Sequence, residues 1–133
     1  RDGTLLFEPK DGLVRELKFI PGTISALKKF VENGFKLILI SNQDGLGTPK
    51  NPTKLFEKIN EKLFEILASE NVKFDEIFVC PHVEKDACEC RKPRTGLLTK
   101  FLIKTPIDPE NSFVIGDRET DLKLAENLGI RGF

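Results

Sequence analysis

The chain has 133 residues, of which 39% are hydrophobic, and its 21 basic and 21 acidic residues give a formal net charge of zero. This length suits one domain with one hydrophobic core. A balanced charge argues against nucleic acid or a membrane surface recognised through bulk charge, and no apolar run approaches the length of a membrane span. We therefore expect a single domain without a nucleic-acid or membrane partner.

The first half of the chain predicts one helix followed by one strand. Thr23 is the candidate N-cap of the helix, and Gly34 marks its end. Apolar side chains recur inside it at the spacing of one helical face, at Ile24, Leu27, Phe30 and Val31. Residues 35–40 then form a short, mostly apolar run that ends before Ser41, which is typical of a buried parallel strand.

The second half alternates in the same way. Thr53 is the candidate N-cap of a helix that runs to about Asn71 and buries Phe56, Ile59, Leu63 and Leu67. The remaining expected elements are two strands at 74–79 and 112–115, a short helix over 97–102 and a last helix after Asp121. We expect the last helix to stop at Gly129 and to bury Leu122, Ala125 and Leu128.

Strands that alternate with helices indicate an α/β fold, a Rossmann-like parallel sheet with helices on both faces. In such sheets, ligands bind at the carboxyl ends of the strands. Ser41 and Asn42 follow one predicted strand, Asp117 follows another, and Lys92 is reached from a third through a loop. A hydroxyl, backbone N–H groups and an ammonium suit a phosphate, and acids beside them suit Mg²⁺. Taken singly, these residues have plainer interpretations as a turn, a surface lysine and a helix-start acid.

The loop after the second predicted strand holds all three cysteines and the only histidine, at Cys80, His82, Cys88 and Cys90. Three thiolates and an imidazole form a complete tetrahedral ligand set for Zn²⁺, and such a closed site folds a loop rather than activating water. Alternatively, the thiols are structural or two of them pair, although Cys88 and Cys90 are too close for a relaxed disulfide. Thiols that serve as metal ligands fit a reducing, cytoplasmic location.

Four short segments resemble the four motifs of the haloacid dehalogenase superfamily of phosphatases. They are RDGT at 1–4, ISN at 40–42, RKP at 91–93 and GDRETD at 116–121. The cysteine-rich loop narrows the resemblance to the branch that contains histidinol-phosphate phosphatase and heptose-bisphosphate phosphatase. SNQDGLGT at 41–48 is more similar to the former, which is the N-terminal domain of a bifunctional histidine-biosynthesis enzyme in some bacteria.

The resemblance implies a role for each catalytic residue. Asp2 would be the general acid that protonates the leaving alkoxide and then the base that activates water. Ser41 and the amide of Asn42 would hold the transferring phosphoryl group, and Lys92 would neutralise its charge. The expected reaction is hydrolysis of L-histidinol phosphate through an aspartyl-phosphate intermediate.

The resemblance also implies two metal ions. The candidate magnesium residues are Asp2, through its backbone carbonyl, Asp117, as a ligand, and Asp121, as support of the metal shell. Zinc would be held by Cys80, His82, Cys88 and Cys90. We expect the zinc to fix the loop that carries Lys92 into the site.

Specificity is expected to come from short loops, because the segments between the motifs leave no room for a large cap domain. Glu8 and Asp44 are candidate contacts for the amine and imidazole of histidinol, and Arg91 is a further candidate substrate contact. The expected partner is a small phosphomonoester. The resemblance also suggests a parent protein in which an imidazoleglycerol-phosphate dehydratase domain follows.

The sequence departs from the family at its start. The family motif is Asp-x-Asp-Gly-Thr, and its first Asp is the nucleophile, whereas this sequence begins at Arg1, the x position. We therefore expect a chain truncated before Arg1, with the nucleophile and the strand before it missing. A clipped end after Phe133 is expected as well.

Three other functions compete with this interpretation. A heptose-bisphosphate phosphatase would use the same chemistry on a sugar. A nucleic-acid 3′-phosphatase shares the chemistry, but the neutral charge and the lack of a basic stripe count against it. A non-catalytic, zinc-stabilised binding module would have lost its nucleophile.

Overall fold

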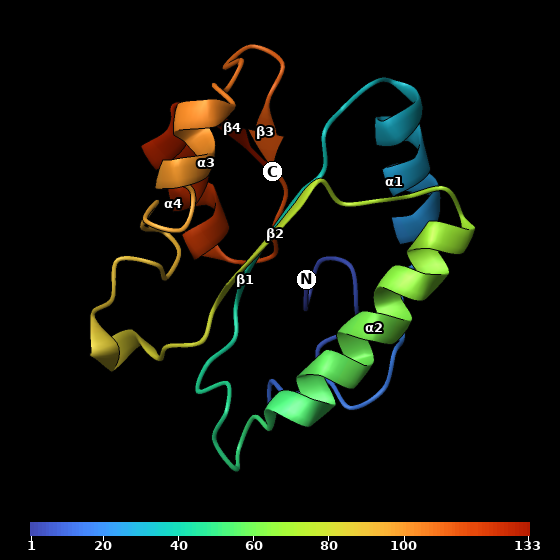
Figure 1. Ribbon diagram of the computed structural model, residues 1–133, viewed down its shortest axis with the longest axis vertical. Coiled ribbons are helices and arrows are strands. Elements are labelled where there is room, and N and C mark those ends of the chain that lie inside the picture. Colours follow the sequence, from blue (N-terminus) through green and yellow to red (C-terminus); the bar gives the residue numbers. More distant parts are fainter. The chain divides into compact units, whose positions relative to one another are not determined.

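The computed structural model describes residues 1–133 and divides into two compact units. The first comprises Arg1–Ile40 and Leu46–Ile77, and the second Ser41–Gly45 and Phe78–Phe133. The elements, labelled in Figure 1, are α1 (Thr23–Glu32), β1 (Ile38–Asn42), α2 (Thr53–Ser69), β2 (Glu76–Cys80), the 3₁₀ turn η1 (Glu84–Asp86), α3 (Thr99–Lys104), β3 (Phe113–Val114), α4 (Glu119–Leu128) and β4 (Arg131–Gly132). None of the helices combines the length and the apolar character needed to cross a membrane.

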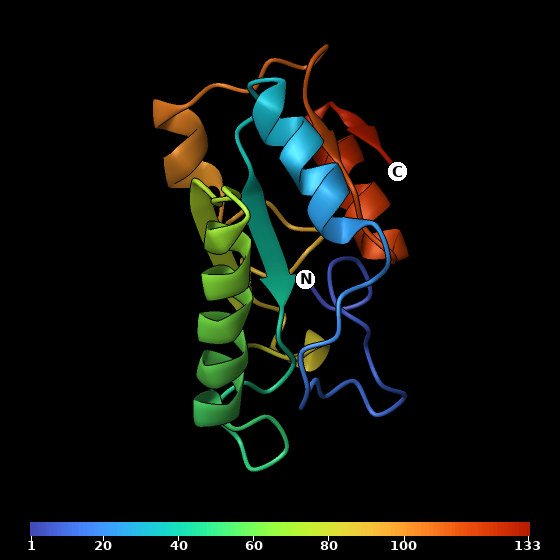
Figure 2. The ribbon, with the colours of Figure 1, turned by 90° about the vertical axis from the view of Figure 1, so that its right-hand side faces the viewer.

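The core of the first unit lies around α1 and the long helix α2, which Figure 2 shows along its length. Its buried residues are Leu6, Val14, Leu27, Leu37, Ile59, Leu63, Leu67 and Val72. The predicted inner face of α2 is confirmed at Ile59, Leu63 and Leu67. Phe56 is only half-buried, and the guanidinium of Arg1 lies 4.6 Å from its ring centroid. The helical periodicity in the sequence therefore located half of this core, the four buried residues that lie in α1 and α2.

The two predicted N-caps are wrong by one residue. Thr23 and Thr53 are the first residues inside α1 and α2, and the capping positions belong to Gly22 and Pro52. The buried hydroxyl of Thr23 donates instead to the carbonyl of Leu5, at 3.3 Å. A threonine inside the first turn is available for such tertiary contacts because it does not occupy the capping position.

The predicted end of α1 is confirmed at Gly34. This glycine adopts a φ of 79°, a left-handed conformation that costs glycine little. The Gly34 N–H donates to the carbonyl of Val31 and the Phe35 N–H to that of Phe30, both at 3.0 Å. These bonds are of the kind that ends helices. Val31 recurs at the predicted helical spacing, but it is 36% exposed and does not belong to the buried residues of α1.

The strands form two separate two-stranded pieces, β1 with β2 and β3 with β4. β3 and β4 are parallel, with Phe113 opposite Arg131 and Val114 opposite Gly132. The α/β content and a parallel strand pair are thus as predicted. β1 begins later than predicted, because both backbone groups of Leu37 are bonded to Asp75. The Leu37 N–H donates to the Asp75 carboxylate and the Leu37 carbonyl accepts from the Asp75 N–H, each at 2.8 Å.

In the second unit, α4 packs on β3 and β4, as Figure 1 shows. A β-carbon added at Gly132 would lie 3.0 Å from that of Ala125, so the strand approaches the helix closely. The buried residues of α4 are Asp121, Leu124 and Ala125, whereas Leu122 is 43% exposed. The predicted burial of Leu122 is therefore wrong, because Asp121 takes an inward position that hydrophobicity alone would not assign to an acid.

Candidate active site and metal-binding loop

The end of β1 presents a buried serine whose hydroxyl is oriented by its neighbour. Ser41 and Gln43 are 4% and 6% exposed, and the Gln43 Nε2 group donates to Ser41 Oγ at 2.8 Å. The Gln43 N–H also donates to the carbonyl of Cys80, at 2.7 Å. Since Oγ accepts from Gln43, its own hydrogen is available for another acceptor, such as a phosphate oxygen. Sequence reasoning missed Gln43, although it directly follows the ISN motif.

Lys92 is held at both ends by side chains of the second unit. The Asn42 Oδ1 atom accepts from the Lys92 N–H at 3.0 Å, and Asn42 Nδ2 donates to the Lys92 carbonyl at 3.3 Å. The Lys92 ammonium donates to Asp121 Oδ1 at 2.6 Å, and the two side chains are 12% and 7% exposed. Two predicted residues, Asn42 and Asp121, therefore both contact a third, Lys92.

Asp121 also organises the start of α4. Its Oδ2 atom accepts from the backbone N–H of Arg118 at 3.2 Å, so each carboxylate oxygen has a partner. A β-carbon added at Gly116 would lie 2.2 Å from Asp121 Cγ, which leaves space for glycine alone. The glycine in GDRETD thus makes room for the buried acid.

Asp117 lies just before α4, on the segment that joins it to β3. Its side chain is 32% exposed, and Oδ2 lies 3.7 Å from Nε of Arg118. Unlike Asp121, this carboxylate is accessible in part to solvent. It is therefore the better placed of the two acids to bind a hydrated cation.

Asp2 and Glu8 belong to the first unit. Both oxygens of Asp2 accept from Arg1, at 2.6 Å from Nε and 3.0 Å from Nη2. The same guanidinium donates to Oδ1 of Asn60 at 2.6 Å. Asp2 is thus fixed by a buried, forked ion pair, and Glu8 is half-buried in the loop before Pro9.

Two of the predicted substrate contacts pair with each other. The Arg91 guanidinium forms a forked ion pair with the carboxylate of Asp44, with Nη2 to Oδ2 at 3.2 Å. Its Nη1 atom also donates to the carbonyl of His82 at 3.0 Å. Asp44 therefore already has a cationic partner within the protein.

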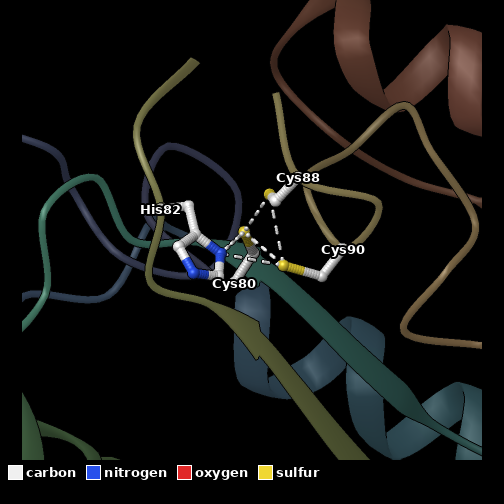
Figure 3. Close-up of side chains that lie close together, drawn as sticks. All are labelled: Cys80, His82, Cys88 and Cys90. Carbon is white, nitrogen blue, oxygen red and sulfur yellow. Dashed lines mark hydrogen bonds between the residues drawn. The ribbon is translucent and has the colours of Figure 1, made fainter. Parts of the chain in front are cut away.

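The metal loop, residues 80–90, gathers the cysteines and the histidine into one cluster (Figure 3). Their ligand atoms all lie within 4.8 Å of one another. The Sγ of Cys80 lies 3.6 Å from that of Cys88 and 3.0 Å from that of Cys90, and Nδ1 of His82 lies 3.1 Å from Cys90 Sγ. A tetrahedral ion with bonds of about 2.3 Å needs sulfurs about 3.8 Å apart. The sulfurs lie closer together than that, so the four donors would spread slightly around a bound ion, and none of the three thiols is in a disulfide.

The thiols of this cluster differ in their readiness to ionise. Burial, together with hydrogen bonding to Cys90, raises the pKa of Cys80 to about 12. Burial also raises the pKa of Cys88, but hydrogen bonds with Cys90 and Cys80 outweigh it and bring the pKa to about 7. A cation bound here would have to displace the proton of Cys80, because thiolates are the metal ligands.

Polar contacts from the protein also hold the backbone of the metal loop. Arg94 Nη1 donates to the carbonyl of Cys88 at 2.6 Å, and the Gly96 N–H donates to that of Glu89 at 3.1 Å. A β-carbon at Gly96 would lie 2.4 Å from the Glu89 oxygen. Together with the bond from Arg91 to His82, these contacts fix the carbonyls of three loop residues.

Comparison with known proteins points to phosphatases. Residues 13–131 match the family described as polynucleotide kinase 3 phosphatase. The chain is 48% identical over 136 residues to the histidine biosynthesis bifunctional protein HisB of Campylobacter jejuni subsp. doylei, covering 99% of this chain and 39% of that protein. It is 46% identical to HisB of Actinobacillus pleuropneumoniae serotype 3, covering 98% and 37%. The chain thus spans less than half the length of these curated relatives.

A solved structure is similar over nearly the whole chain. The crystal structure of D,D-heptose 1.7-bisphosphate phosphatase from B. bronchiseptica, complexed with magnesium and phosphate, matches with a TM-score of 0.86 at 27% sequence identity. The match covers 99% of this chain and 75% of that one. Sequence and structure comparisons therefore agree on a phosphatase fold.

Proposed function

Because the chain belongs to the polynucleotide kinase 3 phosphatase family, we propose that it hydrolyses a small phosphomonoester, L-histidinol phosphate, to L-histidinol and phosphate. The histidine-biosynthesis relatives, at 48% and 46% identity, support this substrate. We propose further that the chain is the phosphatase part of a longer protein that also carries an imidazoleglycerol-phosphate dehydratase domain. The relatives are bifunctional by name, and the chain aligns with 39% of one and 37% of the other.

The observation that carries the proposal is a pair of candidate phosphate-binding groups in the second unit, one of which lies at the end of β1. The Ser41 hydroxyl has its hydrogen free of Gln43, and the Lys92 ammonium is aimed by Asn42 and Asp121. A fixed donor and a fixed cation stabilise the charge on a transferring phosphoryl group, which is the main task in phosphoryl transfer. Asp2 keeps the acid–base role that the family resemblance gives it.

The residues before and in α4 fit a magnesium ion. Asp117 is the carboxylate that would hold the ion. Asp121 acts as support, because Lys92 and the Arg118 N–H already occupy its two oxygens. When bound, Mg²⁺ supplies positive charge to the phosphoryl oxygens.

The metal loop is proposed to bind zinc in a structural role. Its donor set of three thiols and one imidazole is the chemistry that Zn²⁺ prefers, and four protein ligands leave no open position. The loop leads directly into Arg91 and Lys92. Zinc would therefore fix the path of the backbone to the catalytic lysine.

For substrate contacts, the ion pair of Asp44 with Arg91 changes the initial expectation. Asp44 and Arg91 are proposed to act as one unit in the wall of the site rather than as separate charges. Glu8 remains the candidate that would bind the amine or imidazole of histidinol. An acid suits both groups because each can carry a positive charge.

Heptose bisphosphate is the second candidate substrate. The structural match to a heptose-bisphosphate phosphatase favours it. A 3′-phosphorylated nucleic acid fits less well than either small molecule, because the sequence balances 21 basic against 21 acidic residues.

The test is phosphate release by the full-length protein with Mg²⁺. L-Histidinol phosphate, heptose bisphosphate and a 3′-phosphorylated oligonucleotide are offered separately. A Lys62→Gln variant serves as the control, because Lys62 forms an exposed ion pair with Glu65 on α2, outside every motif. We expect the highest kcat/KM with histidinol phosphate. Preference for the heptose would overturn the substrate, preference for the oligonucleotide would overturn the small-molecule class, and release from none would support a non-catalytic binding module.

A further inference from the structure

We propose that the side chain of Asn42 is a positioning device for Lys92, which fixes the backbone of the lysine instead of contacting the phosphoryl group. The inference rests on the proposed function, since it concerns the lysine that would receive the phosphoryl group. It goes beyond the motif, in which the backbone amide of this residue is the phosphate-binding group.

The geometry assigns the orientation of the Asn42 amide without ambiguity. A backbone N–H can only donate and a backbone carbonyl can only accept. The Lys92 N–H lies 3.0 Å from Oδ1 and the Lys92 carbonyl 3.3 Å from Nδ2, so one side-chain amide matches both backbone groups of one residue. Two contacts on the same residue fix its rotation as well as its position.

Lys92 needs such a device because no regular element holds it. It lies outside the helices and strands, between the metal loop and α3, so no ladder of backbone bonds defines its position. Asn42, in contrast, is the last residue of β1 and belongs to regular structure. The asparagine therefore fixes the backbone of a loop residue, Lys92, relative to strand β1.

The other end of the lysine is fixed independently by Asp121. The ammonium donates to the buried carboxylate at 2.6 Å, and that carboxylate is anchored at the start of α4 by the Arg118 N–H. A lysine stem has four rotatable bonds, so the ammonium is aimed only when both backbone and head are held. Misplacement of a catalytic group by about 1 Å can cost about 100-fold in rate.

A second tie between the same two segments supports this arrangement. Asp44, two residues after Asn42, forms the forked ion pair with Arg91, the residue before Lys92. Segments 41–45 and 90–92 are thus joined at two points, Asn42 to Lys92 and Asp44 to Arg91. Asn42 is the tie that acts on Lys92 itself.

A double-mutant cycle tests the inference on the full-length protein. Asn42→Ala is made in the wild type and in a Lys92→Ala background, and kcat/KM and inhibition by inorganic phosphate are measured for all four proteins. If Asn42 acts through Lys92, its replacement lowers kcat/KM about 10- to 100-fold in the wild type and less than about threefold without the lysine. Asn42→Ala should weaken inhibition by inorganic phosphate in the wild type and leave it unchanged in the Lys92→Ala background.

Equal losses in both backgrounds would mean that the amide contacts the substrate, and would overturn the inference. Asn33→Ala is the matched control, because Asn33 is exposed and its Nδ2 donates to the carbonyl of Lys29 at the end of α1. It should leave kcat/KM unchanged. Asn42→Asp, which keeps the acceptor for the Lys92 N–H and loses the donor, should fall between wild type and Asn42→Ala.

Hydrogen exchange separates failure of the inference from failure of the proposed function. Exchange of the Lys92 amide should accelerate at least about tenfold in Asn42→Ala while amides inside α2 stay unchanged. This readout needs no turnover. Unchanged exchange at Lys92 would overturn the positioning role even in an active protein, whereas faster exchange in a protein that releases no phosphate would refute only the proposed function.

Discussion

The buried ion pair between Lys92 and Asp121 predicts a stability effect that an exposed pair would not show. Both side chains are nearly buried, at 12% and 7% exposure, and the nitrogen and oxygen are 2.6 Å apart. Replacing Lys92 by methionine removes the charge but keeps much of the stem. The carboxylate of Asp121 then stays buried without its cation, which typically costs about 3 kcal/mol or more.

Helix α4, which carries Asp121, also offers a matched control. Lys123 pairs with Glu119 at 2.7 Å, but these side chains are 52% and 77% exposed. Lys123→Met should therefore cost less than about 0.5 kcal/mol. The double variant Lys92→Met/Asp121→Asn should recover more than half of the loss, because a neutral amide can still accept from the Arg118 N–H.

Native-state hydrogen exchange of amides in α4 measures these effects locally, which suits a chain without Trp or Tyr. A loss of about 3 kcal/mol raises the exchange rate by about two orders of magnitude, whereas the control should change it about twofold. Similar rates for Lys92→Met and Lys123→Met would refute the reasoning. They would mean that Asp121 gains no net stabilisation from the lysine.

Three further predictions follow from the site. Gln43→Glu replaces the donor to Ser41 Oγ by an acceptor, so the serine hydrogen should turn toward residue 43 and away from the substrate. The kcat in a phosphate-release assay should then fall about 10- to 100-fold. An unchanged kcat would argue against a role of this hydrogen bond. A thiol-compatible chelator, which would remove a zinc ion from the metal loop, should accelerate amide exchange over residues 81–91 and lower turnover even after Mg²⁺ is restored. Full activity in a sample verified as zinc-free would contradict the structural role of zinc. Gly116→Ala should destabilise the protein by about 1–3 kcal/mol, because the new β-carbon would lie 2.2 Å from Asp121 Cγ, and a thermal midpoint equal to that of the wild type would show that the acid can move aside.

Local patterns in the sequence were enough to locate most elements of the fold. The apolar faces of α2 and the stop of α1 at Gly34 follow from helical periodicity and from the conformational freedom of glycine. The cysteine-rich loop was equally visible, because all four candidate metal ligands lie within one short segment. These features depend on neighbours in sequence, and local rules are sufficient for them.

Features that depend on distant partners were not predictable in this way. The ion pair of Asp44 with Arg91 joins residues 47 apart, and the contact of Lys92 with Asp121 joins residues 29 apart. The inward position of Asp121 shifted the buried face of α4 away from Leu122. A buried acid is stabilised by its tertiary partner, and the residues next to it in sequence do not indicate which residue that partner is.

The most direct test of the central claim is phosphate release from L-histidinol phosphate by the full-length protein and by its Lys92→Ala variant, at saturating Mg²⁺. Lys92 is predicted to neutralise the phosphoryl group, so the wild type should turn over and the variant should lose at least about 100-fold in kcat. A variant that kept turnover within about threefold of wild type would contradict the claim, because the lysine held by Asn42 and Asp121 would then have no part in the reaction.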